Sequence, residues 1–303
     1  MTTLKLPFAI LNAFTTRIDG GNPAAVIRTT PEQDASLTDA QRLTIARNLN
    51  QPMHIFVTPT DDPEAFRVRW IMTTQEVVLC GHATFCASGL IFGEEPGSPF
   101  YMQGAKAART LNFNGLENSL TGSKVDDGKI EVALEVARVE DLIREDPRAV
   151  KLRAAVAAAC GADLTVVYLG AGVGLAYGCY SLIEVGTDDL AGLTVNFDHL
   201  RNTGFTDHIF TARPSSAARE AGVTFEVRVF APVLGMNEDP VCGSAHALLA
   251  PYWTEKLGIQ GQTMRSHQVS SRGGDLWVIL DEEKGLVKLA GYVVKVVEGT
   301  IAA

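Results

Sequence analysis

The 303-residue sequence predicts an α+β protein built from two similar, strand-rich lobes. Segments with the composition of β-strands dominate the chain, and each half holds one prominent apolar helix. The two helix starts also resemble each other, since VVLCGHATFCASGLIF at 77–92 and DPVCGSAHALLAPYW at 239–253 share the order Cys-Gly-polar-Ala. This similarity between two distant segments, called here the Cys-Gly echo, favours an internal repeat over a chance coincidence of two Cys-Gly helix starts. We therefore expect each lobe to present the N-terminus of its central helix.

The first half of the chain reads as strands with two helices. Residues 34–50 predict a helix that Ser36 or Thr38 can cap. The stretch EVVLCGHATFCASGLIFGEE predicts a strand that breaks at Gly81 into the first central helix. Four further segments have the pattern of strands: LPFAILNAF, AAVIRT, HIFVTPT and FRVRWIMT.

The second half repeats this mixture. Residues 103–135 predict hairpins with Gly, Asn and Asp turns, and the stretch 121–129 is a plausible crossing point between the lobes. Residues 140–160 predict a helix, and the second strand-to-helix break falls at Cys242-Gly243. The tail, 275–300, predicts a strand, a turn and two strands. The other predicted strands are TVVYLGAG, YSLIEVGT, DHIFTAR and TFEVRVFAP.

The composition excludes several classes of protein. The formal net charge is −9, and no Lys/Arg cluster is dense enough for nucleic-acid binding. No apolar run approaches the roughly 20 residues that span a bilayer, and the N-terminus lacks the pattern of a signal peptide. The five cysteines are dispersed and form no CxxC pair. They favour free thiols in a reducing, cytoplasmic compartment over a disulfide framework or a zinc site.

The two helix starts suit a site for a small anion. A helix N-terminus has unpaired N–H groups and the positive end of the dipole, so two such ends facing each other would hold a carboxylate or an enolate. Gly81 and Gly243 let the backbone bend sharply and let a ligand approach closely. Ser244 can cap the helix or contact the ligand, and the dipole is expected to lower the pKa of the Cys242 thiol. Asp239 lies just ahead, within reach of the same pocket.

Each of these residues also has a purely structural interpretation. A cysteine is often a small buried hydrophobe. Ser244 could be only an N-cap, and Asp239, which precedes a proline, could be only a turn former. His82 lies at a strand-to-helix break rather than in an apolar stripe, which favours a functional role. His246, one turn into its helix, is expected to pack rather than react.

A known family matches five segments in order along the chain: FTTRIDGGNPAAVI, FRVRWIMTTQEVVLCGHATFCAS, FAPVLGMNEDPVCGSAHALLAPYW, SRGGDLWV and LAGYVVKVVEGT. The sequence resembles the PhzF-like (phenazine-biosynthesis-like) proteins, relatives of diaminopimelate epimerase. The resemblance implies two pseudo-symmetric lobes, each a curved, mostly antiparallel sheet or barrel around a central helix, with the active site in the cleft between them. We expect residues 1–120 with about 288–303 to form the N-terminal lobe and residues 121–287 the C-terminal lobe.

The resemblance also implies isomerisation or epimerisation of a small anionic or carbonyl-bearing molecule, with no cofactor and no metal. From the charge and hydropathy we expect no nucleic-acid or membrane partner, and the resemblance implies a possible homodimer. In the family's isomerase a glutamate moves a proton, aided by a histidine, an aspartate, a serine and backbone amides. His82 and Asp239 match the histidine and the aspartate. The implied substrate contacts are Asn22, Met53, His54, Gly81, Ala83, Gly243, Ser244 and Ala245.

One position departs from the family pattern. The segment IARNLNQPMHIFV aligns without a gap and places Met53 where the family has its glutamate, with His54 next to it. A methionine side chain cannot carry a proton, so the usual general base is missing.

Three explanations of this departure are open. His82 and Asp239 could act as the acid–base pair in a rearrangement, dehydration or cyclisation, with His54 as a further candidate. Alternatively, Cys80 and Cys242, which resemble the paired thiols of diaminopimelate epimerase, could exchange protons on opposite faces of the substrate. In the third explanation the protein has lost catalysis and kept a cleft that binds a ligand or a partner.

Overall fold

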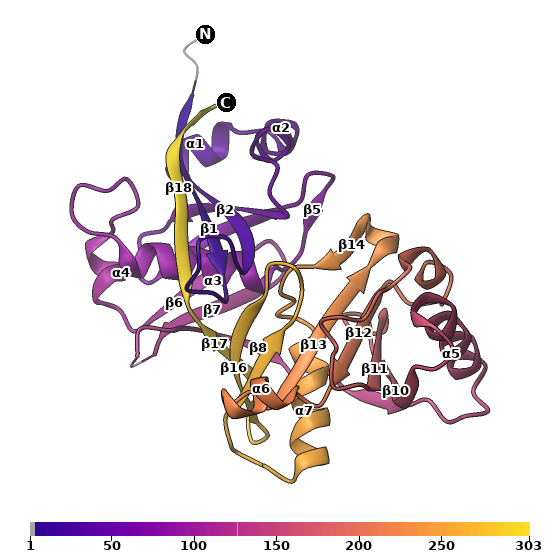
Figure 1. Ribbon diagram of the computed structural model, residues 1–303. Helices are drawn as coiled ribbons and strands as arrows, with labels where there is room; N and C mark the ends of the chain where they lie inside the picture. The colour runs from indigo at the N-terminus through magenta and orange to yellow at the C-terminus, as the bar shows by residue number, and fades with distance from the viewer. Residues whose placement is uncertain (1–3, 126) are drawn as a thin grey trace. The chain divides into compact units, whose positions relative to one another are not determined.

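Figure 1 shows a computed structural model, which describes residues 4–125 and 127–303. The contacts divide the chain into two compact units. Unit 1 comprises Met1–Ala133 with Ala290–Ala303, and unit 2 comprises Leu134–Leu289. Each unit combines a mostly antiparallel sheet with a helix of largely buried residues, so the predicted α+β class is confirmed.

The sheet of unit 1 begins with β1, which pairs with β2 on one side and β18 on the other. From β2 the pairing continues through β3, β4, β6 and β7, and the short β5 pairs with β4. The pairs β2–β3 and β4–β6 are parallel and the others are antiparallel. The strands are β1 (Lys5–Ala13), β2 (Asn22–Arg28), β3 (Met53–Pro59), β4 (Ala65–Ile71), β5 (Glu76–Val77), β6 (Thr110–Asn114), β7 (Ser119–Lys124) and β18 (Val293–Ala302).

The central helix of unit 1 is α3 (Gly81–Gly93), which contacts β1, β2, β3 and β7 (Figure 1). Most of its residues are buried, because strands surround it on several sides. Gly89 allows β18 to lie close, since a Cβ atom there would come within 2.8 Å of the Val293 side chain. The ring of Phe85 packs against that of Phe14, with 4.5 Å between centroids. The prediction of a central helix after Gly81 is therefore confirmed.

The predicted helix at 34–50 is two helices, α1 (Pro31–Ser36) and α2 (Asp39–Leu49). Leu37 has an extended backbone, which ends the first helix. Thr38 then caps the second by accepting a hydrogen bond from the N–H of Gln41. The prediction named Thr38 correctly as a cap and missed that its extended conformation interrupts the helix. A fourth helix, α4 (Gln103–Ala107), precedes β6.

The strands of unit 2 pair in the order β9–β10–β11–β12–β13, and both β14 and β15 pair with β13. The last pair within this run is β15–β16. The strands are β9 (Val139–Asp141), β10 (Thr165–Gly172), β11 (Tyr180–Gly186), β12 (Asp207–Ala212), β13 (Phe225–Ala231), β14 (Met236–Asp239), β15 (Met264–Gln268) and β16 (Gly274–Asp281). Two further strands, β8 (Ile130–Glu135) and β17 (Leu286–Gly291), extend across the boundaries between the units.

The two units repeat one order of strand pairing. In unit 1 the pairing is antiparallel for β1–β2, parallel for β2–β3, antiparallel for β3–β4 and for β4–β5, parallel for β4–β6 and antiparallel for β6–β7. In unit 2 the pairs β10–β11, β11–β12, β12–β13, β13–β14, β13–β15 and β15–β16 have the same six directions in the same order. The internal repeat predicted from the two Cys-Gly helix starts is thus present in the topology.

The helices of unit 2 are α5 (Pro147–Cys160), α6 (Ser216–Glu220) and α7 (His246–Leu257), with 3-10 turns η1 (Phe197–Leu200) and η2 (Pro232–Leu234). The predicted helix at 140–160 starts later than expected, because Asp146 caps it and residues 139–141 pair as a strand with β10. The central helix α7 packs on β13, where the ring of Trp253 stacks on that of Phe225. No helix among the described residues is long and apolar enough to cross a membrane.

Candidate functional site

The first helix start lies in unit 1, between β5 and α3. Cys80 precedes the helix with an extended backbone, and its carbonyl accepts the first helical hydrogen bond, from the Thr84 N–H. The N–H groups of Gly81, His82 and Ala83 come before this bond and have no acceptor within the helix. Three amides at the positive end of the helix dipole are therefore directed away from the helix.

His82 is the polar side chain at this helix start. Its Nδ1 lies 3.3 Å from the Cys80 Sγ. Its Nε2 is buried and has no hydrogen-bond partner among the residues that the structure describes. Burial lowers the pKa of His82 to about 4, against the smaller opposing effect of the nearby Pro23 carbonyl. The ring is therefore neutral at pH 7, and one buried nitrogen remains for a ligand.

Three other residues of the predicted site lie on neighbouring strands of unit 1. Asn22 begins β2 and is buried, and Met53 begins β3 with only 7% of its surface exposed. His54 is fully buried, and both of its ring nitrogens bond to the backbone, Nδ1 to the Ile71 carbonyl and Nε2 to the Gln51 N–H. Burial lowers its pKa to about 4. Because both ring nitrogens are occupied by backbone groups, we interpret His54 as a structural histidine.

The second helix start lies in unit 2, between β14 and α7. Helix α7 begins at His246, three residues after the predicted break, because Gly243, Ser244 and Ala245 form a tight turn with i to i+3 hydrogen bonds. Neither Gly81 nor Gly243 has a positive φ, so neither position requires the left-handed backbone that glycine favours.

A glutamine side chain fixes the approach to this helix. The Gln268 Oε1 accepts a hydrogen bond from the Cys242 N–H at 2.8 Å, and its Nε2 donates to the Asp239 carbonyl at 2.6 Å. The Asp239 Oδ1 accepts from the Val241 N–H at 3.0 Å. Gln268 is fully buried, so these bonds hold the turn that presents Asp239 and Cys242.

Three side chains form a hydrogen-bonded row beside this turn. The Tyr180 hydroxyl lies 2.9 Å from the Ser244 Oγ, and the Ser244 Oγ lies 3.4 Å from the Cys242 Sγ. His246 faces elsewhere, with Nδ1 bonded to the Cys242 carbonyl and Nε2 to the Ser266 hydroxyl, so it packs as predicted. The structure thus brings Ser244 and Cys242 together and adds Tyr180, which the sequence analysis missed.

The protonation states of this row differ from those expected. Burial raises the pKa of the Cys242 thiol well above its usual value, and the nearby Asp239 carboxyl adds to the effect. The predicted lowering of this pKa is therefore wrong, because loss of solvent outweighs the helix dipole. Burial also raises the pKa of Tyr180. Both groups remain neutral hydrogen-bond donors at pH 7.

Asp239 is a carboxyl of unit 2 whose pKa is raised to near neutrality, to about 7. Burial of the carboxyl is the largest cause, the hydrogen bond from the Val241 N–H opposes it, and the charge of Asp207 acts in the same direction as burial. Asp207 begins β12 and was read from the sequence only as part of a strand. One signal could have found it, because DHIFT at 207–211 repeats MHIFV at 53–57.

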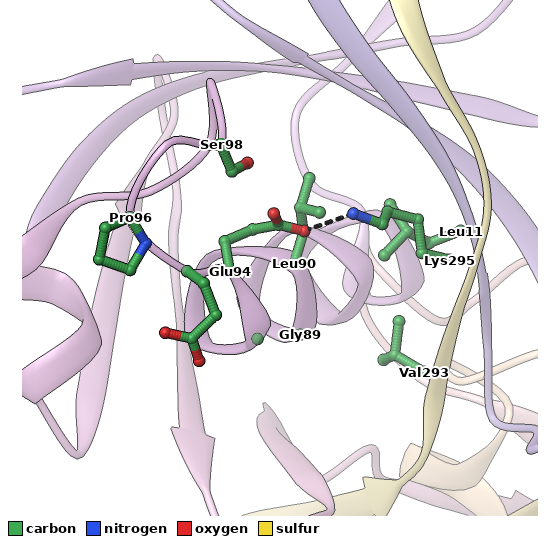
Figure 2. A pocket seen from close by; sticks show the side chains of 10 residues that line it. Leu11, Gly89, Leu90, Glu94, Pro96, Ser98, Val293 and Lys295 are labelled. Carbon is green, nitrogen blue, oxygen red and sulfur yellow. Dashed lines mark hydrogen bonds and ion pairs between the residues drawn. The ribbon is translucent and has the colours of Figure 1, made fainter.

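A separate pocket of about 440 Å³ lies in unit 1, at the opposite end of α3 (Figure 2). Glu94 and Lys295 point toward each other across it, with 2.7 Å between Oε1 and Nζ. None of the predicted site residues lines this pocket. Within residues 4–125 and 127–303, no group of three or more His, Cys, Asp or Glu side chains is arranged to hold a metal ion.

Comparison with known proteins decides the family. The family model described as "Phenazine biosynthesis-like protein" matches residues 11–138 and 185–299. The chain belongs to this PhzF-like family. The matched ranges include both helix starts, with Cys80, His82, Asp239 and Ser244.

Individual relatives match nearly the whole chain. A human phenazine biosynthesis-like domain-containing protein is 31% identical, covering 99% of this chain and 100% of its own length. An uncharacterized isomerase of Pseudomonas aeruginosa is 32% identical, covering 98% of this chain and 99% of its own. The crystal structure of a PhzF-family protein from Enterococcus faecalis superposes with a TM-score of 0.79 at 27% identity, covering 98% of this chain and 99% of that one.

Proposed function

We propose that this protein is a cofactor-independent isomerase that moves a proton on a small anionic or carbonyl-bearing metabolite. Membership of the PhzF-like family supports an isomerase-type activity. The observation that carries the proposal is the Asp239 carboxyl, which the Val241 N–H and Gln268 hold ahead of α7. Burial raises its pKa to about 7, which suits a group that both takes and returns a proton.

In this proposal Asp239 carries the proton and His82 donates a hydrogen bond. The Asp239 carboxylate removes a proton from a carbon next to a carbonyl or carboxyl group, and the electron pair of that bond moves onto the oxygen to form an enolate. Protonated Asp239 then returns the proton to another carbon of the conjugated system. When Nδ1 of His82 accepts from the Cys80 thiol, its buried Nε2 carries the hydrogen that stabilises the enolate oxygen.

The backbone amides of residues 81–83 and 243–245 supply further donors for negative charge. We propose that both helix starts act on the same molecule. The two-thiol mechanism is less well supported, because it needs a thiolate at Cys242 and the pKa of that thiol is raised.

Deuterium exchange tests the proposed function. Small 2-oxo acids and β,γ-unsaturated carboxylic acids are incubated with the protein in D₂O, and deuterium incorporation is followed by NMR. We expect His82→Ala and Asp239→Asn each to slow exchange by about 10²-fold or more. The matched controls are His199→Ala and Asp163→Asn, which change exposed residues of the same types. Absence of exchange on every compound that binds would instead support a non-catalytic binding protein.

A double variant tests whether the two helix starts share a substrate. Groups that act as one unit in a single step have non-additive effects. His82→Ala combined with Asp239→Asn should therefore be little slower than the slower single variant. Two losses that multiply would argue for independent roles.

We further propose a cytoplasmic location. None of the five cysteines, all of which the structure describes, forms a disulfide, and Cys160 and Cys179 are partly exposed; such thiols are usual in a reducing compartment. Fractionation with a tagged chain would test it.

A further inference from the structure

The internal repeat assigns equivalent positions to residues of the two units. Strand β3 pairs in parallel with β2 starting from Met53, and β12 pairs in parallel with β11 starting from Asp207. The next residue of each strand is a buried histidine, His54 and His208, and each begins the antiparallel pairing with the following strand. The same place in the topology thus carries an apolar side chain in unit 1 and a carboxyl in unit 2.

The strand register places this carboxyl on the face that carries Asp239. Ile209 is the partner of Val229, and Val229 is also the partner of Asp239. Asp207 lies two residues before Ile209, so its side chain points to the same face as those of Ile209 and Asp239. Tyr180, the partner of Asp207 on β11, also shares this face. Its hydroxyl reaches Ser244, which locates the face beside the start of α7.

Asp207 is enclosed and charge-coupled to Asp239. Only 9% of its surface is exposed, and the Thr206 hydroxyl donates to its Oδ2 at 2.6 Å. Two carboxyls in a buried environment resist simultaneous ionisation, because their negative charges repel where water screens them poorly. An ionised Asp207 is therefore expected to make Asp239 hold its proton to a higher pH.

We propose that Asp207 is a positioning residue for Asp239, a second carboxyl that holds the proton on Asp239 by charge repulsion across β13. This inference rests on the proposed function in one respect only, that Asp239 is the proton carrier. In the internal repeat, Asp207 at the start of β12 is the counterpart in unit 2 of Met53 at the start of β3 in unit 1. Asp207 acts through Asp239 and needs no contact with the substrate.

The other charged and titratable groups around Asp239 have different roles. Glu238, its neighbour on β14, forms an ion pair with Arg228 of β13 at 2.7 Å, so its charge is compensated. The Cys242 thiol donates to the Asp239 carboxylate and favours its ionised form. Tyr180 is neutral and bonded to Ser244. The negative charge of Asp207 opposes ionisation of Asp239. Among the described residues, no cationic side chain lies within hydrogen-bond distance of the Asp207 carboxyl to compensate this charge.

Carboxyl titration by NMR tests the inference on the full-length protein without any substrate. Aspartate is labelled with ¹³C at the side-chain carboxyl, and the Asp239 signal is assigned with Asp239→Asn. We expect Asp207→Asn to lower the midpoint of the Asp239 titration by about one unit or more, the coupling at which two sites titrate together. Asp163→Asn, which removes the same charge from an exposed position of unit 2, should leave the midpoint unchanged. An Asp239 midpoint that is equal in Asp207→Asn and in the parent would overturn the proposal.

A second variant keeps the test decisive if Asp207→Asn does not fold. Asp207→Ser removes the same negative charge with a smaller side chain, so it should lower the Asp239 midpoint in the same direction. An Asp239 midpoint that is unchanged in this variant would also refute the charge repulsion. The two proposals can fail separately. If the proposed function is wrong and this inference is right, Asp207→Asn still lowers the Asp239 midpoint, but the protein catalyses no deuterium exchange.

Discussion

Asp239→Asn should stabilise the protein at alkaline pH while it removes the proposed activity. The folded-state pKa is about 7 against an ordinary value of 3.8, so the native state binds the proton more tightly than the unfolded state. At 1.36 kcal/mol per pKa unit, the difference corresponds to about 4 kcal/mol. Because the folded pKa is raised, stability is highest below pH 4, falls as the pH rises to 7 and is constant above it.

Asparagine keeps an oxygen that can accept the Val241 N–H bond and carries no proton to lose. The advantage of the variant over the parent should therefore grow by about 3 kcal/mol between pH 5 and pH 8. Urea unfolding at the two pH values measures it, followed by the tryptophan fluorescence to which the buried Trp70 of unit 1 and Trp253 of unit 2 contribute. Asp163→Asn serves as the control for the loss of one charge.

An advantage of equal size at pH 5 and pH 8 would refute this reasoning. It would mean that the Asp239 carboxyl is already ionised in the folded protein at pH 5. Its value as a proton carrier near neutrality would then be lost as well.

Three further outcomes follow from the contacts of unit 2. Tyr180→Phe should cost about 1 kcal/mol in urea unfolding, because Ser244 loses its hydrogen bond, and should slow deuterium exchange if Ser244 contacts the substrate. The Cys242 thiol should react with iodoacetamide at pH 8 at least about tenfold more slowly than free cysteine, as measured by peptide mass spectrometry, since burial keeps it protonated. Gln268→Leu should cost about 2–5 kcal/mol in urea unfolding, because it leaves the buried Cys242 N–H and the Asp239 carbonyl without this partner.

The sequence contained enough information for the fold class and for the two helix starts. Strand composition and the Cys-Gly echo are local patterns, and the pairing order of both units repeats as the echo predicted. Element boundaries were less predictable. Leu37 and residues 139–141 are extended although their surroundings favour helix, because a cap and a strand partner decide the conformation there.

The site was predictable only in part, because the missing residues act through tertiary contacts. Tyr180, Asp207 and Gln268 are distant in sequence from the EDPVCGSAH motif, and strand register brings Tyr180 and Asp207 to one face. The error at Cys242 has a similar cause. A helix dipole can be read from sequence, whereas the burial that outweighs it depends on how β13, β15 and α7 pack.

The two helix starts are chemically unequal although their topology is the same. In unit 1 the histidine is neutral at any pH above about 4, and the strand start carries Met53. In unit 2 the corresponding strand start carries Asp207, and the nearby Asp239 titrates near pH 7. A change of activity with pH around neutrality should therefore come from unit 2 alone. It follows that Met53→Glu would add a proton carrier to the unit that lacks one, and a second inflection in the pH profile of exchange would report it.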